Sequence, residues 1–124
     1  MEFHTRATIF AEGCHGHLSK SIIQKYNLRA KAENQTYGIG LKELWEIPAE
    51  KHSPGRVEHT VGWPLDRHTY GGSFLYHLKD DSPLVAVGLV VGLDYQNPYL
   101  SPFREFQRFK HHPSISETLS GGKR

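Results

Sequence analysis

An uninterrupted apolar run from Leu84 to Leu93 constrains the fold more than any other feature of this sequence. The run is about half as long as the ~20 residues that a helix needs to cross a bilayer. Both of its alternating sets of side chains are apolar, as in strands that are buried on two sides. We therefore expect a central strand, covered on both faces of a sheet.

Three other segments show the period of two that is typical of strands. Side chains alternate in residues 37–45 and 57–63, and Ser73–Leu78 forms a third strand-like run. Turn-forming residues separate the segments, at Ser53-Pro54-Gly55, Pro64-Leu65-Asp66-Arg67 and Asp80-Asp81-Ser82-Pro83. Such short connections predict a mainly antiparallel meander.

A helix is predicted after the last strand. Ser101 is a suitable N-cap and Pro102 a suitable first helical residue, and Pro113 should stop a helix running to about His111. A short helical turn over Ser116–Leu119 is expected before the glycine pair 121–122. The helix should offer the sheet an aromatic face made of Phe103, Phe106 and Phe109. The predicted fold class is α+β, with a mainly antiparallel sheet packed by one or two helices.

The N-terminal residues have a different pattern. Ala7–Ala11 is a short apolar run of the kind found in parallel sheets, and a helical pattern follows from about His17 to Tyr26. A strand, a glycine-containing turn and a helix make half of a βαβ unit. A lone parallel strand cannot form a sheet, so we expect this piece to complete a sheet formed elsewhere.

The turn between that strand and helix is a candidate cofactor contact at Glu12 and Gly13. Amides at a helix N-terminus attract phosphate, and glycine allows close backbone approach. An acidic residue and a glycine before a helix are similar to the second flavin-contacting fingerprint of hydroxylase-type flavoproteins. Gly16 and Ser19 stand where that fingerprint has serine and arginine. An ordinary strand–helix turn is the alternative.

Composition excludes several other functions. The single cysteine, Cys14, cannot form an intrachain disulfide or an iron–sulfur cluster site by itself. Its neighbours His15 and His17 fit no common zinc spacing. The net charge of +2 comes from scattered side chains, so no nucleic-acid partner is expected. The first residues do not resemble a targeting segment.

A second candidate site lies at Tyr70-Gly71-Gly72. Paired glycines weaken a strand, and they often occur where a ligand or another backbone comes close. Their backbone groups could bond a carbonyl ligand while Tyr70 and Phe74 supply apolar surroundings. A β-bulge or a tight turn without a ligand is the alternative for this segment.

Four long blocks together resemble one family, electron transfer flavoprotein–ubiquinone oxidoreductase. They are Phe10–Leu18, Tyr37–Trp45, Gly62–His77 and Gly88–Gln107, and they cover nearly the whole chain in order. The resemblance implies an oxidoreductase with FAD, a [4Fe–4S] cluster and ubiquinone. Such an enzyme takes electrons from reduced electron transfer flavoprotein and delivers them to membrane quinone, at the matrix face of the mitochondrial inner membrane.

The resemblance also implies roles for individual residues. Gly71 and Gly72 match the backbone pair that hydrogen-bonds the quinone head group, with Tyr70 adjacent, and Glu12 and Gly13 match the edge of the flavin domain. Residues 1–27 would then belong to an FAD-binding domain, and residues 28–124 to an incomplete ubiquinone-binding domain. No catalytic side chain and no metal ligand is expected in this chain.

The chain departs from the family pattern in three ways. It lacks a Gly-x-Gly-x-x-Gly fingerprint, the cluster cysteines and the membrane-contacting segments of the family. We therefore expect an internal piece that is inactive alone. Two alternatives stay open: a related flavoprotein reductase acting on isoprenoid lipids, and a non-catalytic truncated product.

Overall fold

A computed structural model describes all residues from 1 to 124. The chain forms two compact units, Met1–Gln35 and Thr36–Arg124, and each is described by itself. The assignment of residues 1–27 to an FAD-binding domain and of residues 28–124 to a ubiquinone-binding domain stays a prediction.

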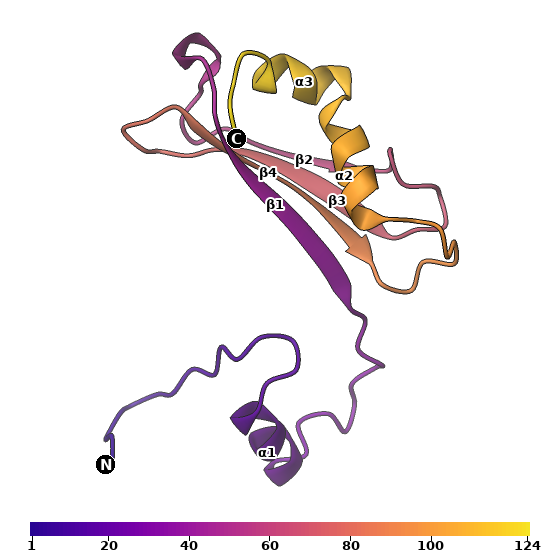
Figure 1. The fold of residues 1–124 in the computed structure, drawn as a ribbon. Helices are drawn as coiled ribbons and strands as arrows, with labels where there is room; N and C mark the ends of the chain where they lie inside the picture. The colour runs from indigo at the N-terminus through magenta and orange to yellow at the C-terminus, as the bar shows by residue number, and fades with distance from the viewer. The chain divides into compact units, whose positions relative to one another are not determined.

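The larger unit contains a four-stranded antiparallel sheet with two α-helices (Figure 1). Every strand predicted in residues 36–93 is present, and the α+β fold class is confirmed. The elements are β1 (Gly38–Glu46), the 3₁₀ helix η1 (Ala49–Lys51), β2 (Val57–Val61), β3 (Gly71–His77), β4 (Leu84–Gly92), α2 (Pro102–Lys110) and α3 (Pro113–Leu119).

The strand order is β1-β4-β3-β2. The meander prediction is right for β2, β3 and β4, which pair in sequence order, but wrong for β1. That strand pairs with β4 along its whole length, from Gly38 opposite Gly92 to Glu46 opposite Leu84. β4 is therefore central, as its apolar sequence predicts, because it has a hydrogen-bonded neighbour on each side.

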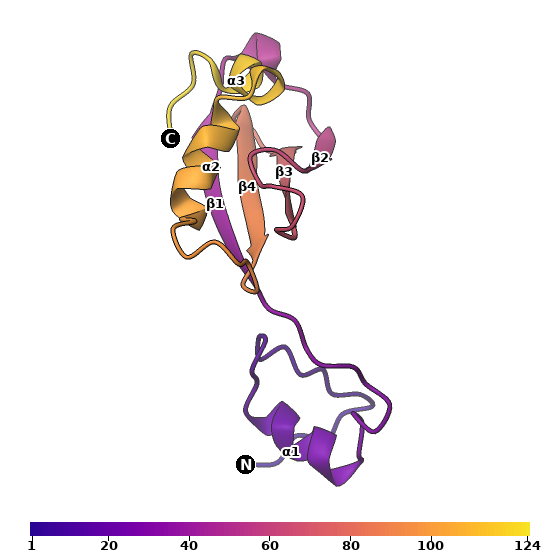
Figure 2. The ribbon, with the colours of Figure 1, turned by 90° about the vertical axis from the view of Figure 1, so that its right-hand side faces the viewer.

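Both helices of this unit lie on the same side of the sheet, which we call the covered face (Figure 2). One alternating set of β4 side chains points toward α2 and α3 and is almost completely buried. The core consists of Ile47, Leu65, Leu75, Val85, Val87, Leu89, Val91, Phe106, Phe109, Ile115 and Leu119.

The other side of the sheet, which we call the open face, has no helix of this unit over it. Val90 of the central strand is partly exposed there, so the predicted cover on both faces is wrong for this unit. Val61 is 86% exposed on the same face. The main side chains of the open face are Leu44, Val57, His59, Val61, Phe74, Tyr76 and Val90.

The start of α2 is as predicted, since the Ser101 hydroxyl accepts a hydrogen bond from the Arg104 N–H at 3.4 Å. The aromatic face is only partly right: Phe106 and Phe109 are buried, whereas Phe103 is 56% exposed. Steps of three residues drift by about 60° each around a helix, which turns the first ring away from the sheet.

The second helix of this unit is longer than expected. α3 begins at Pro113 and not at Ser116, because proline fits the first turn of a helix as well as it ends the preceding one. It ends at Leu119, before the glycine pair as predicted.

The smaller unit contains one helix, α1 (Leu18–Lys25), close to its predicted position. Residues 7–11 do not form the predicted strand. A strand needs a hydrogen-bonded neighbour, and this chain offers none to that segment. None of the helices combines the length and apolar character required to span a bilayer.

Candidate functional site

Gly71 and Gly72 are the first two residues of β3, and their backbone groups point in opposite directions. The Gly92 N–H donates to the Tyr70 carbonyl oxygen at 2.7 Å, so the polar groups of Tyr70 face β4. Successive residues of an antiparallel strand alternate in this respect. The polar backbone groups of Gly72 therefore face β4 as well, and those of Gly71 face the β2 side.

On that side the strand β2 has already ended. Its last residue, Val61, lies opposite Gly72, so Gly71 extends one position beyond it. No strand neighbour is present to take the N–H and C=O of Gly71. These groups are therefore positioned to bond a ligand at the end of the sheet.

Two hollows lie beside these glycines. The first, of about 330 Å³, is lined by Gly71, Gly72, His59 and Phe74, and the second, of about 340 Å³, by Gly38 and Gly92 among others. Tyr70 and Val90 line both. Tyr70 is 82% exposed. Apolar walls with a few backbone polar groups suit a flat, apolar molecule that carries carbonyl oxygens.

The packing of the sheet by itself requires glycine at both positions. A Cβ atom on Gly71 would overlap the Val90 carbonyl oxygen and a methyl group of Leu65, and a Cβ on Gly72 would lie 2.7 Å from the Thr60 carbonyl oxygen. The strand register runs unbroken through both glycines, so neither a bulge nor a tight turn explains them. The close approach of neighbouring backbone atoms within the sheet explains both glycines.

Glu12 forms a cap on α1. Its carboxylate accepts hydrogen bonds from the N–H groups of His17 at 3.1 Å, Leu18 at 3.1 Å and Ser19 at 2.7 Å. The Ser19 hydroxyl also donates to it, at 2.5 Å. This hydroxyl first, and then the amides of Ser19 and His17, lower the pKa of Glu12 to about 2.

The cap has a consequence for the predicted flavin contact. The amides expected to attract phosphate are bound to Glu12 in this structure. Gly13, with a φ of 77°, makes the turn that brings the carboxylate back onto the helix. A cofactor role for Glu12 and Gly13 stays a prediction.

The side chains present do not fit a metal site or an iron–sulfur cluster. No three His, Cys, Asp or Glu residues gather where they could hold a metal ion. Cys14 is exposed and is the only cysteine, whereas a [4Fe–4S] cluster takes four thiolates.

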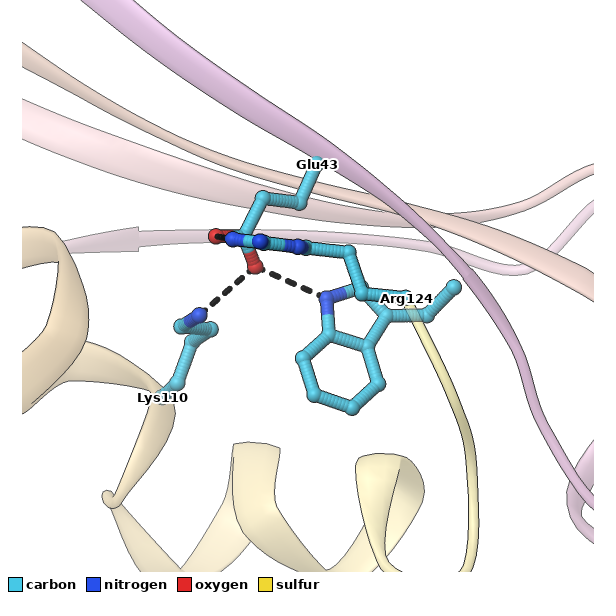
Figure 3. Close-up of polar contacts among 4 residues, drawn as sticks. Glu43, Lys110 and Arg124 are labelled. Carbon is cyan, nitrogen blue, oxygen red and sulfur yellow. Dashed lines mark hydrogen bonds and ion pairs between the residues drawn. The ribbon is translucent and has the colours of Figure 1, made fainter.

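A buried charge cluster on the covered face was missed by sequence reasoning (Figure 3). Glu43 of β1, 8% exposed, accepts bonds from Lys110 of α2 at 2.6 Å, the Trp45 indole at 2.8 Å and Arg124 at 3.1 Å. Burial alone would raise the pKa of Glu43, but these three donors outweigh it and lower the pKa. A glutamate within the apolar set Leu41 and Trp45 was the signal that could have revealed it.

The cluster holds the C-terminal residues and α2 against strand β1. The backbone of Lys123 exchanges two hydrogen bonds of 2.9 Å with Glu46, at the outer edge of β1. Together with the bond from Arg124 to Glu43, this fixes the C-terminal residues and α2 to the same strand. The cluster therefore stabilises the covered face and lies away from the hollows.

Comparison with protein families gives one match. Residues 37–124 match the family model described as "ETF-QO, ubiquinone-binding". The matched segment contains the whole sheet, both helices of the larger unit, the first hollow and all of the lining of the second except Thr36.

Curated relatives match along the whole chain. The chain is 74% identical over 124 residues to the mitochondrial electron transfer flavoprotein-ubiquinone oxidoreductase of Bos taurus, and 65% identical over 125 residues to that of Caenorhabditis elegans. It is 56% identical over 124 residues to the Pseudomonas aeruginosa protein of that name without the mitochondrial designation. All of this chain is covered in each case, but only 20%, 21% and 22% of the relatives.

Proposed function

Since the chain belongs to the electron transfer flavoprotein–ubiquinone oxidoreductase family, we propose that it carries the quinone-binding sheet of an enzyme that passes electrons from reduced electron transfer flavoprotein to ubiquinone. The observation that carries this proposal is the backbone of Gly71, which β2 leaves without a strand neighbour beside a hollow with apolar walls.

In the proposed complex the quinone ring lies on the open face. One carbonyl oxygen accepts a hydrogen bond from the Gly71 N–H, while Gly72 keeps its place in the sheet. Tyr70, Phe74 and Val90 contact the ring and the first part of the apolar tail. The exposed valines of β2 extend the same apolar surface, which favours a greasy ligand over a polar one.

The redox centres belong to the rest of the proposed enzyme. FAD and a [4Fe–4S] cluster would be held outside this chain, apart from a flavin-domain edge at Glu12 and Gly13. The chain alone would then reduce no quinone. The bovine and nematode relatives are called mitochondrial, which supports a mitochondrial location, and our proposal places the enzyme at the matrix face of the inner membrane.

A binding titration tests this proposal. A ubiquinone analogue with one isoprene unit should quench tryptophan fluorescence of the chain. Tyr70→Ala should weaken its binding roughly tenfold, because an aromatic contact is lost. Tyr99→Ala is the matched control, since Tyr99 is also exposed but lines neither hollow, and it should leave binding unchanged.

Two results would contradict the proposal. Equal affinities of the two variants would show that Tyr70 does not contact the analogue. A titration without any response would show that the chain does not bind a quinone. An isoprenoid diphosphate that lacks the quinone ring but binds equally well would favour the reductase acting on isoprenoid lipids.

A further inference from the structure

We propose that His59 is the acid that protonates the quinone as it is reduced. This inference rests on the proposed function and adds a chemical role that the backbone of Gly71 cannot fill. A glycine N–H can polarise a carbonyl oxygen by hydrogen bonding, but it does not give up its proton.

The sheet register places His59 close to the proposed ring position. His59 lies in the middle of β2, directly opposite Phe74, and its side chain is exposed on the open face. Gly72 is its diagonal neighbour on β3, and such neighbours lie about 7–8 Å apart. His59 also lines the same hollow as Gly71 and Gly72. An imidazole at this place can reach a ligand bonded to Gly71.

The reaction needs a proton source. A quinone takes up two electrons and two protons, and each C=O group becomes C–OH. The electrons would come from the redox centre held by the rest of the proposed enzyme. In our proposal a ring N–H bond of the His59 imidazolium breaks as the O–H bond of the quinol forms. The neutral imidazole regains a proton from hydronium in the solvent, which reaches it on the exposed edge strand, and the second quinone oxygen takes its proton from the same solvent.

The other titratable side chains on this face are phenols, which are weaker acids than an imidazolium. They belong to Tyr70, just before β3, and to Tyr76 of β3. The β4 residues that share this face, Ala86, Gly88 and Val90, carry no titratable group. Histidine is therefore the residue type suited to exchange a proton here.

The remaining polar groups nearby are already engaged or point elsewhere. Glu58 faces the covered side and forms an ion pair with Arg56 at 2.6 Å. The hydroxyls of Thr60 and Ser73 are hydrogen-bonded to each other. Asp94 lines the second hollow only.

The test uses a complete enzyme. The 124 residues of this chain replace the matching segment of the bovine relative, which the 74% identity makes practical. His59→Gln should lower kcat for quinone reduction by about 100-fold or more, with little change in KM for quinone. The pH dependence of kcat should lose the limb that belongs to the imidazole. Added imidazole should restore activity to His59→Ala, and His68→Gln, in the β2–β3 loop, should behave like the unmodified graft.

Three other outcomes would overturn either the acid role of His59 or the proposed function. If the unmodified graft reduces quinone and His59→Gln keeps its kcat and pH profile, the acid role of His59 is wrong and the proposed function stands. A rise in KM without rescue by imidazole would make His59 a binding residue and also overturn the acid role. An unmodified graft that reduces no quinone, beside an active bovine enzyme, would overturn the proposed function.

Discussion

The two faces of the sheet have the same strands but opposite surroundings. On the covered face, alternate side chains of β4 pack against Phe106 and Phe109 and are removed from water. On the open face, apolar side chains of comparable size are exposed, Val61 most of all. One strand thus supplies a core to one side and an unfilled apolar surface to the other.

The difference separates stability from binding. Burial of apolar surface drives folding in proportion to the area removed from water, so the free energy of unfolding should depend on the covered face. Exposed apolar surface contributes little to stability and remains available for a ligand. The two hollows border the end of the open face, and the buried charge cluster lies on the covered one.

The largest loss of stability is expected from truncating a buried side chain of the covered face. Phe106→Ala should lower the free energy of unfolding by about 3–5 kcal/mol, because it removes a ring that is 1% exposed. Phe103→Ala, on the same helix but half-exposed, should cost less than about 1 kcal/mol. Urea unfolding followed by circular dichroism measures both. Equal losses would mean that the two faces do not differ as described.

The second largest loss of stability is expected from changing the buried carboxylate of Glu43. Glu43→Gln should cost about 1.5–3 kcal/mol, since charge-assisted bonds to Lys110 and Arg124 are weakened. The pKa of Glu43 is lower in the folded chain, so its contribution is present above the unfolded pKa and is lost as the pH falls through the folded one. The difference between the two proteins should therefore shrink in acid.

The exposed pair formed by Glu46 and Lys123, at 3.2 Å, provides the control for this prediction. Glu46→Gln should change stability by less than about 1 kcal/mol at neutral pH. A loss as large as that of Glu43→Gln would show that burial does not set the strength of these pairs.

Filling the tight contact at the site should also destabilise the sheet. Gly71→Ala should cost about 1–3 kcal/mol, because its Cβ meets the Val90 carbonyl oxygen and Leu65. Gly40→Ala is the matched strand glycine, since a Cβ there meets only a Val90 methyl group at 3.7 Å, and it should be tolerated. Thermal unfolding distinguishes them. Tolerance at Gly71 would mean that its glycine serves the ligand alone.

A smaller effect is expected from pH. Burial first, and then the nearby charges of His52 and Arg56, lower the pKa of His77. His77 therefore binds a proton more readily in the unfolded chain than in the folded one. The free energy of unfolding should fall as the pH drops from about 7.5 to about 5.5. In His77→Gln this slope should be shallower, and in His111→Gln, at the exposed end of α2, it should persist. Identical slopes in both variants would contradict this assignment.

The smallest change in stability should come from the open face. Val61→Ser should alter the free energy of unfolding by no more than about 0.5 kcal/mol, because Val61 is exposed. The same variant should weaken binding of the ubiquinone analogue, whose apolar contact it removes. A large loss of stability would make the open face part of the core and would break the comparison.

Much of the fold could be predicted because it follows from local pattern. The apolar run at residues 84–93 identified the central strand, and Ser101-Pro102 located the start of α2. The position of β1 could not be predicted, since its pairing with β4 joins residues far apart in sequence. Nor could the side that the helices cover, because both faces of β4 are equally apolar. Residues 7–11 do not form the expected strand, because this chain provides no neighbouring strand for them to pair with.

The site was only partly predictable. The glycine pair could be located from its composition, but the reason for it depends on Leu65 and Val90, which only the fold brings there. His59 was one of nine scattered histidines in the sequence, and the register of β2 against β3 places it at the hollow. Glu12, the predicted cofactor contact, caps its own helix in this structure, and its cofactor role stays a prediction.

The central claim is that the open face binds a quinone at Gly71 while the covered face serves only stability. The most direct test is a two-dimensional NMR titration of the isotope-labelled chain with the single-isoprene ubiquinone analogue. We predict that the amide signals of Gly71, His59 and Val90 shift with a common dissociation constant, and that those of Phe106 and Phe109 do not move. Shifts confined to α2 and α3, or none along β3, would contradict the account.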